Sequence, residues 1–196
     1  MKPCDILTFC ELLGRLKHLP RTGWVNNGVE HPETVSGHMY RMAMLSLLLG
    51  DNDDSGSRTT LDKTKCMMMS LVHDLAESIV GDITPMCGVS HEEKLKREEQ
   101  ALQRIILLLP NEVGRTMFDL WKEFEECSTA EAKAVKDLDK FDMIMQAFEY
   151  ERTLNRPNFL QPFFTSTQGT FQNPTVLQWV AELEKRRSGC EQEGPN

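Results

Sequence analysis

Residues 61–80 read LDKTKCMMMSLVHDLAESIV, and this stretch indicates most clearly how the chain folds and where its chemistry lies. Its apolar residues recur with a helical period, so we predict a single long helix over the whole stretch. An α-helix turns about 100° per residue, so Glu77 would lie about 40° round the axis from His73, and Asp74 about 100°. All three side chains can therefore converge on one point.

The pair of His73 and Asp74 is a candidate metal site. An imidazole beside a carboxylate is a ligand set that suits Mn, Co, Zn or Fe, and Glu77 on the same side could orient a water on the metal. A His-Asp dipeptide alone is more often a core histidine beside a capping or salt-bridged aspartate. The rest of the sequence has to decide between the two interpretations.

The composition is that of an ordinary soluble domain. The chain has 196 residues, of which 40% are hydrophobic and 27% charged, so we predict one globular domain. No apolar stretch is long enough to span a bilayer, and the N-terminus lacks the pattern of a signal peptide. The six cysteines form no C-x-x-C pair, as expected of reduced thiols. We therefore expect a cytoplasmic protein without a membrane partner.

The net charge of −8 argues against a nucleic-acid polymer as the partner, because binding many phosphates needs clustered Lys and Arg. A small phosphorylated substrate is still compatible with this charge. In that case a metal ion and a few placed cations must reverse the local potential.

Nearly all other segments also have a helical period, and none has a convincing strand pattern. Further helices are predicted over residues 5–18, 38–49, 91–109, 112–126, 129–153 and 173–187. We expect Ser36, Ser90 and Ser128 to cap three of them, and Asn173 to cap the last, where Pro174 follows. The prediction is an all-α fold in one domain over residues 1–187, with a disordered tail over 188–196.

Additional metal ligands are expected on two of these helices. His38 lies in the first turn of its helix, and the helix 129–153 carries three aspartates, Asp137, Asp139 and Asp142. Two histidines and two aspartates would hold a transition metal and leave positions open for water and substrate. Helical periodicity cannot choose among the three aspartates, because Asp137 and Asp142 both lie nearer the apolar face.

Three stretches together carry a family resemblance. Pro-Glu-Thr-Val-Ser-Gly-His (32–38), Leu-Val-His-Asp-Leu-Ala-Glu (71–77) and Val-Gly-Asp-Ile-Thr-Pro (80–85), with Leu-Asp-Lys at 138–140, resemble the HD-domain metal-dependent phosphohydrolases. The resemblance is to their 5'-deoxynucleotidase branch, and it covers about residues 9–186. It implies an HD-domain helical bundle and a homodimer. It also implies hydrolysis of deoxyribonucleoside 5'-monophosphates to deoxynucleoside and phosphate, with a divalent metal such as Mn, Co, Mg, Zn or Fe.

The resemblance also implies a ligand set for the metal. The matching positions are His38, His73, Asp74 and Asp139, the last chosen by the Leu-Asp-Lys pattern of the family. One position departs from that pattern, because Gly37 stands where the family usually has Asp or Glu. Because of this departure, a supporting carboxylate near the start of the helix is not expected here, whereas the metal ligands are unaffected.

Glu77 and Asp82 are the candidate catalytic carboxylates. Glu77 can accept a proton from a water whose pKa the metal lowers; the alternative is a plain salt bridge. Asp82 could contact the sugar or protonate the leaving 5'-oxygen, or it could hold a second metal together with Glu77 and the backbone carbonyl of Ile83. The alternative for Asp82 is an ordinary turn residue after a glycine.

Arg21 and Trp24 precede His38 in a loop, where the resembling branch has an Arg and a Trp that recognise the nucleotide. Arg offers a two-pronged donor to phosphate and the indole a stacking face to a base. The alternative is a Trp packed over helix ends with the Arg stacked on it.

Two rival functions share most of these features. Other HD-type hydrolases act on cyclic nucleotides, alarmones or nucleoside triphosphates with the same metal ligands, although the short chain and the Arg21–Trp24 loop favour a monophosphate. A non-catalytic helical interaction protein with a structural metal is the second rival. Glu77 and Asp82 argue against it, because a structural site needs neither.

Overall fold

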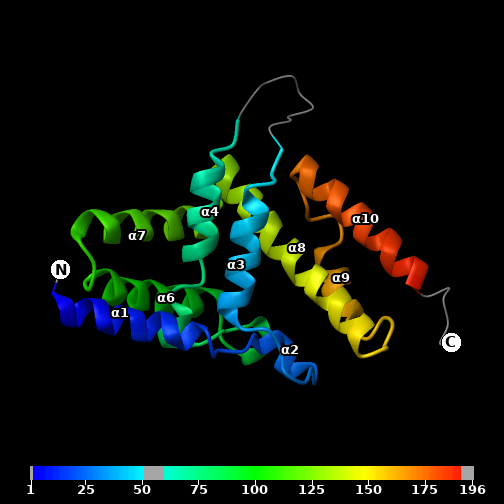
Figure 1. Ribbon diagram of the computed structural model, residues 1–196, viewed down its shortest axis with the longest axis horizontal. Helices are drawn as coiled ribbons and strands as arrows, with labels where there is room; N and C mark the ends of the chain where they lie inside the picture. Colours follow the sequence, from blue (N-terminus) through cyan, green and yellow to red (C-terminus); the bar gives the residue numbers. More distant parts are fainter. Residues whose placement is uncertain (1, 51–59, 191–196) are drawn as a thin grey trace.

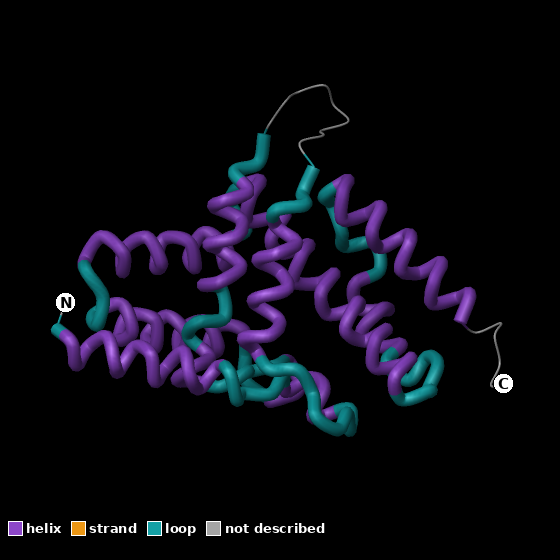
Figure 2. The backbone as a smooth tube through the Cα atoms, viewed as in Figure 1, coloured by secondary structure: helices purple, strands orange, loops and turns teal. Residues whose placement is uncertain are grey.

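The computed structural model describes residues 2–50 and 60–190, and the regular structure in these ranges is helical (Figures 1 and 2). The prediction of an all-α fold is confirmed. The elements in chain order are α1 (Pro3–Leu16), α2 (Thr22–Asn26), α3 (Val35–Ser46), α4 (Lys63–Val72), α5 (Glu77–Val80), the 3₁₀ turn η1 (Pro85–Cys87), α6 (His91–Ile106), α7 (Asn111–Glu126), α8 (Ala130–Thr153), α9 (Gln161–Thr167) and α10 (Pro174–Cys190). Within the described ranges, no helix is both long and apolar enough to cross a membrane.

Helices α3, α4 and α8 form the centre of the molecule, with α1, α6 and α7 on one side and α9 and α10 on the other (Figure 1). The larger hydrophobic cluster surrounds α8 and includes Met42, Met69 and Leu138. A smaller cluster, which includes Leu75 and Leu102, joins α1, α4, α6 and α7. The central helices are therefore held from both sides, which gives any site among them a rigid base.

The predicted single helix over residues 61–80 is wrong, because it is two helices with a turn between them. Helix α4 ends at Val72 and α5 begins at Glu77. Between them the backbone N–H groups of residues 75 and 77–79 donate to the carbonyl three residues earlier instead of four. The carbonyl of Ser70 accepts from the Nδ1–H of the His73 ring at 2.9 Å, where a continuous helix would have a backbone N–H as the donor. The break thus occurs at the histidine itself.

Several helix ends differ from the prediction by a few residues. Thr34, not Ser36, caps α3, because its backbone is extended and its Oγ1 accepts from the N–H of Gly37. Likewise Thr129, not Ser128, caps α8. These serines and threonines are close neighbours, and local propensity does not distinguish them.

The C-terminal helix begins as predicted. Asn173 accepts from the N–H groups of Thr175 and Val176, and Pro174 occupies the first position. The helix continues to Cys190, beyond the predicted end at residue 187. Residues 191–196 lie outside the described part of the chain, so the predicted disorder of the tail stays a prediction there. Helices α2 and α9 were not predicted, because both are short and lie in stretches rich in Gly, Asn or Pro.

Candidate metal centre and active-site cavity

The four predicted metal ligands lie together, although they come from three parts of the chain. His38 lies in α3, His73 and Asp74 at the end of α4, and Asp139 in α8. Asp74 Oδ2 is 3.1 Å from His73 Nε2 and 3.7 Å from His38 Nε2. Asp139 Oδ1 is 3.3 Å from His38 Nε2. The structure thus brings the two imidazoles and Asp74 within 4.8 Å of one another, and it places Asp139 beside His38.

The imidazoles present their Nε2 atoms to this point. The Nδ1–H of His38 donates to Asp142 Oδ2 at 2.6 Å, and that of His73 to the carbonyl of Ser70 at 2.9 Å. Both Nε2 atoms are buried, and neither makes a hydrogen bond of normal geometry with the described residues, although carboxylate oxygens of Asp74 and Asp139 lie 3.1 and 3.3 Å away. A buried imidazole nitrogen without a partner is costly unless a ligand occupies it. The donor set and these two free nitrogens fit a divalent transition metal.

When no metal is bound, the surroundings of His38 favour the doubly protonated, positively charged form of its ring. Burial and Arg21 lower the pKa of His38, but Asp139 and Asp142 raise it by more, to about 9. Because a metal needs the neutral ring, metal binding at neutral pH must release this proton.

Behind His38 lies a polar network that the sequence analysis did not identify. Asp142 is fully buried, and the guanidinium Nε of Arg41 donates to its second oxygen. Arg41 in turn donates to Glu149 at 2.8 Å and to Gln146 at 2.7 Å. These partners hold the Asp142 carboxylate in place and keep its pKa below the ordinary value despite burial, with the His38 ring and Arg41 as the causes.

The three candidate aspartates of α8 have three different surroundings. Asp139 faces the two imidazoles, and Asp142 supports His38 from behind. Asp137 instead accepts from the N–H groups of Gln172 and Asn173 at 2.6 and 2.7 Å, so it anchors the start of α10. Asp137 is therefore a structural residue.

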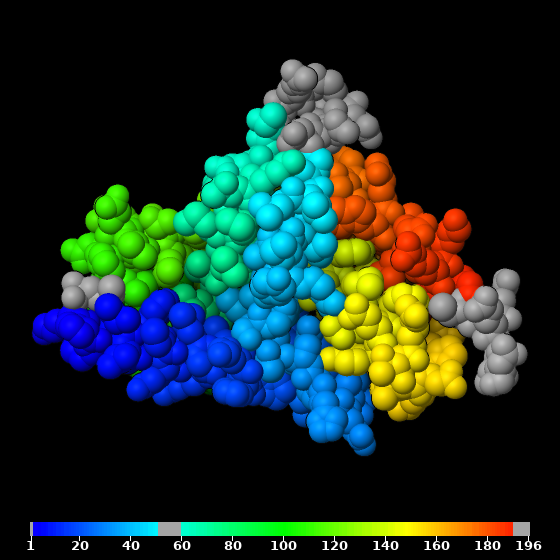
Figure 3. Space-filling model, in the orientation of Figure 1, coloured from blue at the N-terminus to red at the C-terminus, as the bar shows by residue number. Residues whose placement is uncertain are grey.

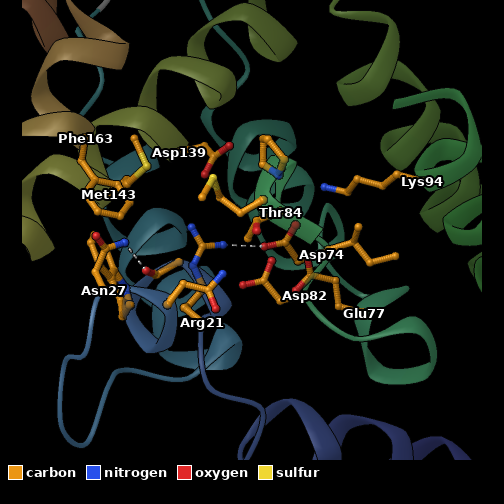
Figure 4. A pocket seen from close by; sticks show the side chains of 16 residues that line it. Arg21, Asn27, Asp74, Glu77, Asp82, Thr84, Lys94, Asp139, Met143 and Phe163 are labelled. Atoms are coloured by element: carbon orange, nitrogen blue, oxygen red, sulfur yellow. Dashed lines mark hydrogen bonds and ion pairs between the residues drawn. The ribbon is translucent and has the colours of Figure 1, made fainter. Parts of the chain in front are cut away.

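A cavity of about 330 Å³ opens over the metal centre (Figure 4). Its polar side carries Asp74, Glu77, Asp82 and Asp139 with two cationic side chains, Arg21 and Lys94. Its apolar side includes Trp24, Met143 and Phe163. The cavity thus combines a charged base with an apolar wall, as expected of a site for a small polar ligand with an apolar part.

Glu77 lies at the charged base of the cavity. The residue is only 3% exposed, and its Oε2 has no hydrogen-bond partner among the described residues. Burial raises the pKa of Glu77 well above the ordinary value, and the nearby charges of Asp74 and Asp82 raise it further. A buried carboxyl group with a perturbed pKa in a cavity is a candidate for proton transfer.

Asp82 follows α5 and reaches across to the start of α2. Its Oδ2 accepts from the N–H of Thr22 at 2.6 Å, and its backbone carbonyl accepts from the Thr22 hydroxyl at 2.8 Å. Asp82 therefore holds the α2 loop against the cavity with one oxygen. Ile83, the next residue, lines the same cavity.

Arg21 points at the metal ligands from the α2 loop, as Figure 4 shows. Its Nη1 lies 3.3 Å from Asp74 Oδ2, and its backbone N–H donates to the carbonyl of Glu33. Although burial opposes it, His73 and then Arg21 hold the pKa of Asp74 well below the usual range. The arginine is thus placed beside the point where an anionic substrate would meet a metal.

Trp24 is packed into the wall of the cavity and presents little surface to its open space. It is 1% exposed, its indole N–H donates to Glu33 at 2.9 Å, and its ring packs on Phe163 at 4.5 Å between centroids. The predicted base-stacking role of Trp24 stays a prediction. Phe163 is less buried and offers the cavity a second aromatic face.

Comparison with known proteins gives a consistent result. A family model described as HD domain matches residues 13–177. The human protein named 5'-deoxynucleotidase HDDC2 is 47% identical over 184 residues, which are 94% of this chain and 87% of the human protein. A protein of the same name from Dictyostelium discoideum is 49% identical over 187 residues, covering 93% of this chain and 98% of its own length.

A solved structure shares the fold as well. The PH0347 protein from Pyrococcus horikoshii superposes with a TM-score of 0.74 at 30% sequence identity, over 92% of this chain and 99% of the other. The match covers 92% of this chain, so it is not limited to the short motifs around the histidines.

Proposed function

The chain belongs to the HD-domain family, and we propose that it is a metal-dependent 5'-deoxynucleotidase that hydrolyses deoxyribonucleoside 5'-monophosphates to deoxynucleoside and phosphate. One observation carries the proposal. Two buried imidazole nitrogens without partners face Asp74 and Asp139 at the base of a cavity that also contains Glu77. Relatives named 5'-deoxynucleotidase that align over more than nine-tenths of the chain support the same function.

His38, His73, Asp74 and Asp139 would hold a divalent metal, with Mn, Co, Mg, Zn and Fe as the candidates. A metal held there acts as a Lewis acid on phosphate oxygens and lowers the pKa of water. The ring nitrogens supply two donors whose tautomer is already set by Asp142 and by the carbonyl of Ser70. Glu77, Asp82 and the Ile83 carbonyl are the candidates for a second metal.

The remaining charged residues act on the substrate. Glu77 orients the attacking water and takes its proton, a role that its position at the charged base of the cavity supports. Arg21 binds the phosphate oxygens beside Asp74 and offsets part of their charge. Asp82 faces the leaving side, where the 5'-oxygen and the sugar are, and its contact with Thr22 keeps it in place.

The nucleoside occupies the apolar side of the cavity. The base lies against the wall of Trp24, Met143 and Phe163, and Asn27 provides an amide at the same end. Trp24 supports the wall, and its base-stacking role belongs to this proposal.

We further propose that the protein is a cytoplasmic homodimer. Helices α3 and α4 and the turn after α3, which lie on the face shown in Figure 3, carry large apolar side chains in contact with solvent. Tyr40 is 65% exposed, Leu48 64%, Met44 49% and Leu71 46%. An apolar face of this kind is typical of a protein interface, and a second copy of the chain is the proposed occupant.

A substrate panel tests the function against its rivals. Metal-loaded protein is given dAMP, a cyclic nucleotide, an alarmone and dATP, and free phosphate or nucleoside is measured. We expect turnover of dAMP only, and loss of about 10²–10⁴-fold in the Glu77→Gln variant with the metal still bound. Turnover of a diester or triphosphate instead would replace the proposal by another HD-type reaction, and no turnover at all would favour the non-catalytic rival.

A further inference from the structure

A second cavity adjoins the active-site cavity and shares three of its residues, Asp74, Lys94 and Asp139. Its volume is about 140 Å³, well above what a single water needs. The rest of its lining is mostly polar and includes His73, His91, Glu98, Glu125 and Lys136. None of these residues except His73 has a part in the function proposed above.

The large cavity contains more negative than positive side chains. Its carboxylates are those of Asp74, Glu77, Asp82 and Asp139, and its cations are Arg21 and Lys94. A phosphate monoester carries between about −1.5 and −2 charges at neutral pH. Arg21 already lies 3.3 Å from Asp74, so much of its charge is used within the protein. The charge of Lys94 is therefore more available to an incoming phosphate than that of Arg21.

Lys94 has the position that this role requires. It extends from α6, and its ammonium group points toward Asp74 and Asp139 from the side opposite Arg21 (Figure 4). Its ion pair with Glu98 is long, at 3.5 Å, and joins residues one turn apart on the same helix. A contact of that kind contributes little stability and can be exchanged for a phosphate oxygen.

Lys136 places a second ammonium in the small cavity. It lies on α8 one turn before Asp139, pairs with Glu125 at 3.2 Å and sits 3.6 Å from the ring centroid of Phe124. The acidic groups of this cavity outside the metal ligands, Glu98 and Glu125, are thus each paired with a lysine. Asp74 and Asp139, the other two carboxylates of the cavity, are the proposed metal ligands, so a bound divalent ion would offset their charge.

We propose that Lys94 and Lys136 form a phosphate subsite in the small cavity. Lys94 contacts the phosphate oxygens of the bound monoester, and the cavity receives the inorganic phosphate that hydrolysis releases. The compact charge of an ammonium group suits phosphate. The two products then leave by different spaces, the nucleoside through the large cavity and phosphate through the small one. This inference rests on the proposed phosphatase function.

The test measures the binding of inorganic phosphate to Mn-loaded protein by calorimetry, beside its inhibition constant against dAMP. We expect Lys94→Gln to weaken phosphate binding at least tenfold, Lys136→Gln to weaken it severalfold, and Lys94→Arg to restore most of the affinity. Lys96→Gln is the matched control, because Lys96 is exposed on the same helix and lines neither cavity. Metal affinity and the melting temperature should stay within error of the wild type in the Lys94 variants.

Phosphate binding to Lys94→Gln that equals that of the wild type would overturn the subsite. An equal loss in Lys96→Gln would also overturn it, because the effect would then be one of general charge. Hydrolysis of dAMP by the wild type is followed in the same preparations. If the wild type does not cleave dAMP, the proposed function fails on that result, while the calorimetric comparison still decides whether the lysines bind phosphate.

Discussion

At the scale of single residues, the two imidazoles of the metal centre differ in what lies behind them. His38 donates to the ionised carboxylate of Asp142, whereas His73 donates to a neutral backbone carbonyl. A carboxylate behind a ligating imidazole raises its basicity and fixes its orientation. His38 should therefore depend more strongly on its supporting residue than His73 does.

We predict that Asp142→Asn lowers metal affinity by about 10–100-fold, because the amide can neither fix the tautomer nor supply the charge. Isothermal titration of the metal-free protein with Mn or Co measures the change. The matched control is Asp137→Asn, a buried aspartate of the same helix that caps the start of α10. The control should lower the melting temperature and leave metal affinity unchanged; a similar loss of affinity in both variants would contradict the assignment of Asp142.

At the scale of helices, α3 begins with an unusual residue. Gly37 occupies the third position of α3, where its N–H is bound by Thr34. A Cβ atom at this position would meet only Thr34 Oγ1, at an ordinary 3.6 Å. Glycine is therefore not required by space, and its helix propensity is about 1 kcal/mol below that of alanine.

We predict that Gly37→Asp stabilises the protein by about 0.5–1 kcal/mol, because an acidic side chain in the first turn also favours the helix dipole. Urea unfolding followed by circular dichroism measures the difference, and metal affinity should not change. Gly81→Ala is the contrasting variant. Gly81 ends α5 with φ +79°, which strains any other residue by about 1–3 kcal/mol. Stabilisation by both substitutions would contradict this account of the two glycines.

Helix α6 carries a buried carboxyl group, Glu98, whose titration should affect stability. Burial raises the pKa of Glu98 to about 7, and although Lys94 opposes this, Asp74 and Glu125 add to it. The ordinary pKa is 4.5, so between these pH values the folded protein holds a proton that the unfolded chain has lost. The free energy of unfolding must therefore fall as pH rises through this range, by at most roughly 3 kcal/mol.

Glu98→Gln should remove this part of the pH dependence. Urea unfolding of metal-free protein at pH 4.5 and pH 8 is compared between the wild type and the variant. We expect the wild type to lose about 2 kcal/mol more than the variant on going to the higher pH. The same loss in both proteins would show that Glu98 titrates alike in the folded and unfolded chain.

The sequence predicts most helices because their apolar faces and caps are local features. It does not predict the turn between α4 and α5, which depends on the His73 ring taking the carbonyl of Ser70. Periodicity also cannot select Asp139 over Asp142, since Asp137 and Asp142 lie nearer the apolar face of α8. Their roles differ only because His38, about a hundred residues earlier, packs between them in the fold.

The supporting residues of the site were missed for the same reason. Arg41 is three residues after His38 and Lys94 is in the charged first turns of α6, so neither has a distinctive sequence context. The role of Arg41 comes from a contact over a long sequence separation, with Asp142, and that of Lys94 from the cavities that it lines. The four proposed metal ligands could be named from sequence because a family pattern already combines such contacts, and their role as ligands stays a prediction.

At the scale of the whole molecule, the exposed apolar face on α3 and α4 bears on assembly. Both helices also carry metal-centre residues, so an interface on their outer side would stiffen the site. We predict that Leu48→Glu, at a side chain 64% exposed, disrupts the proposed homodimer and leaves a folded monomer. Sedimentation equilibrium measures the change, with Leu107→Glu, 83% exposed on another part of the surface, as control. A wild-type protein that sediments as a monomer would contradict the proposed dimer.

The proposed function requires that this helical fold binds a metal ion, and that the bound metal supports the hydrolysis of deoxynucleoside monophosphates. The most direct test is phosphate release from dAMP and from AMP, side by side, with Mn or Co added and His73→Ala as control. We predict release from dAMP well above that from AMP, and none from either in the variant. Equal release from both would contradict the selection of deoxyribose, and release that persists in His73→Ala would contradict the metal centre itself.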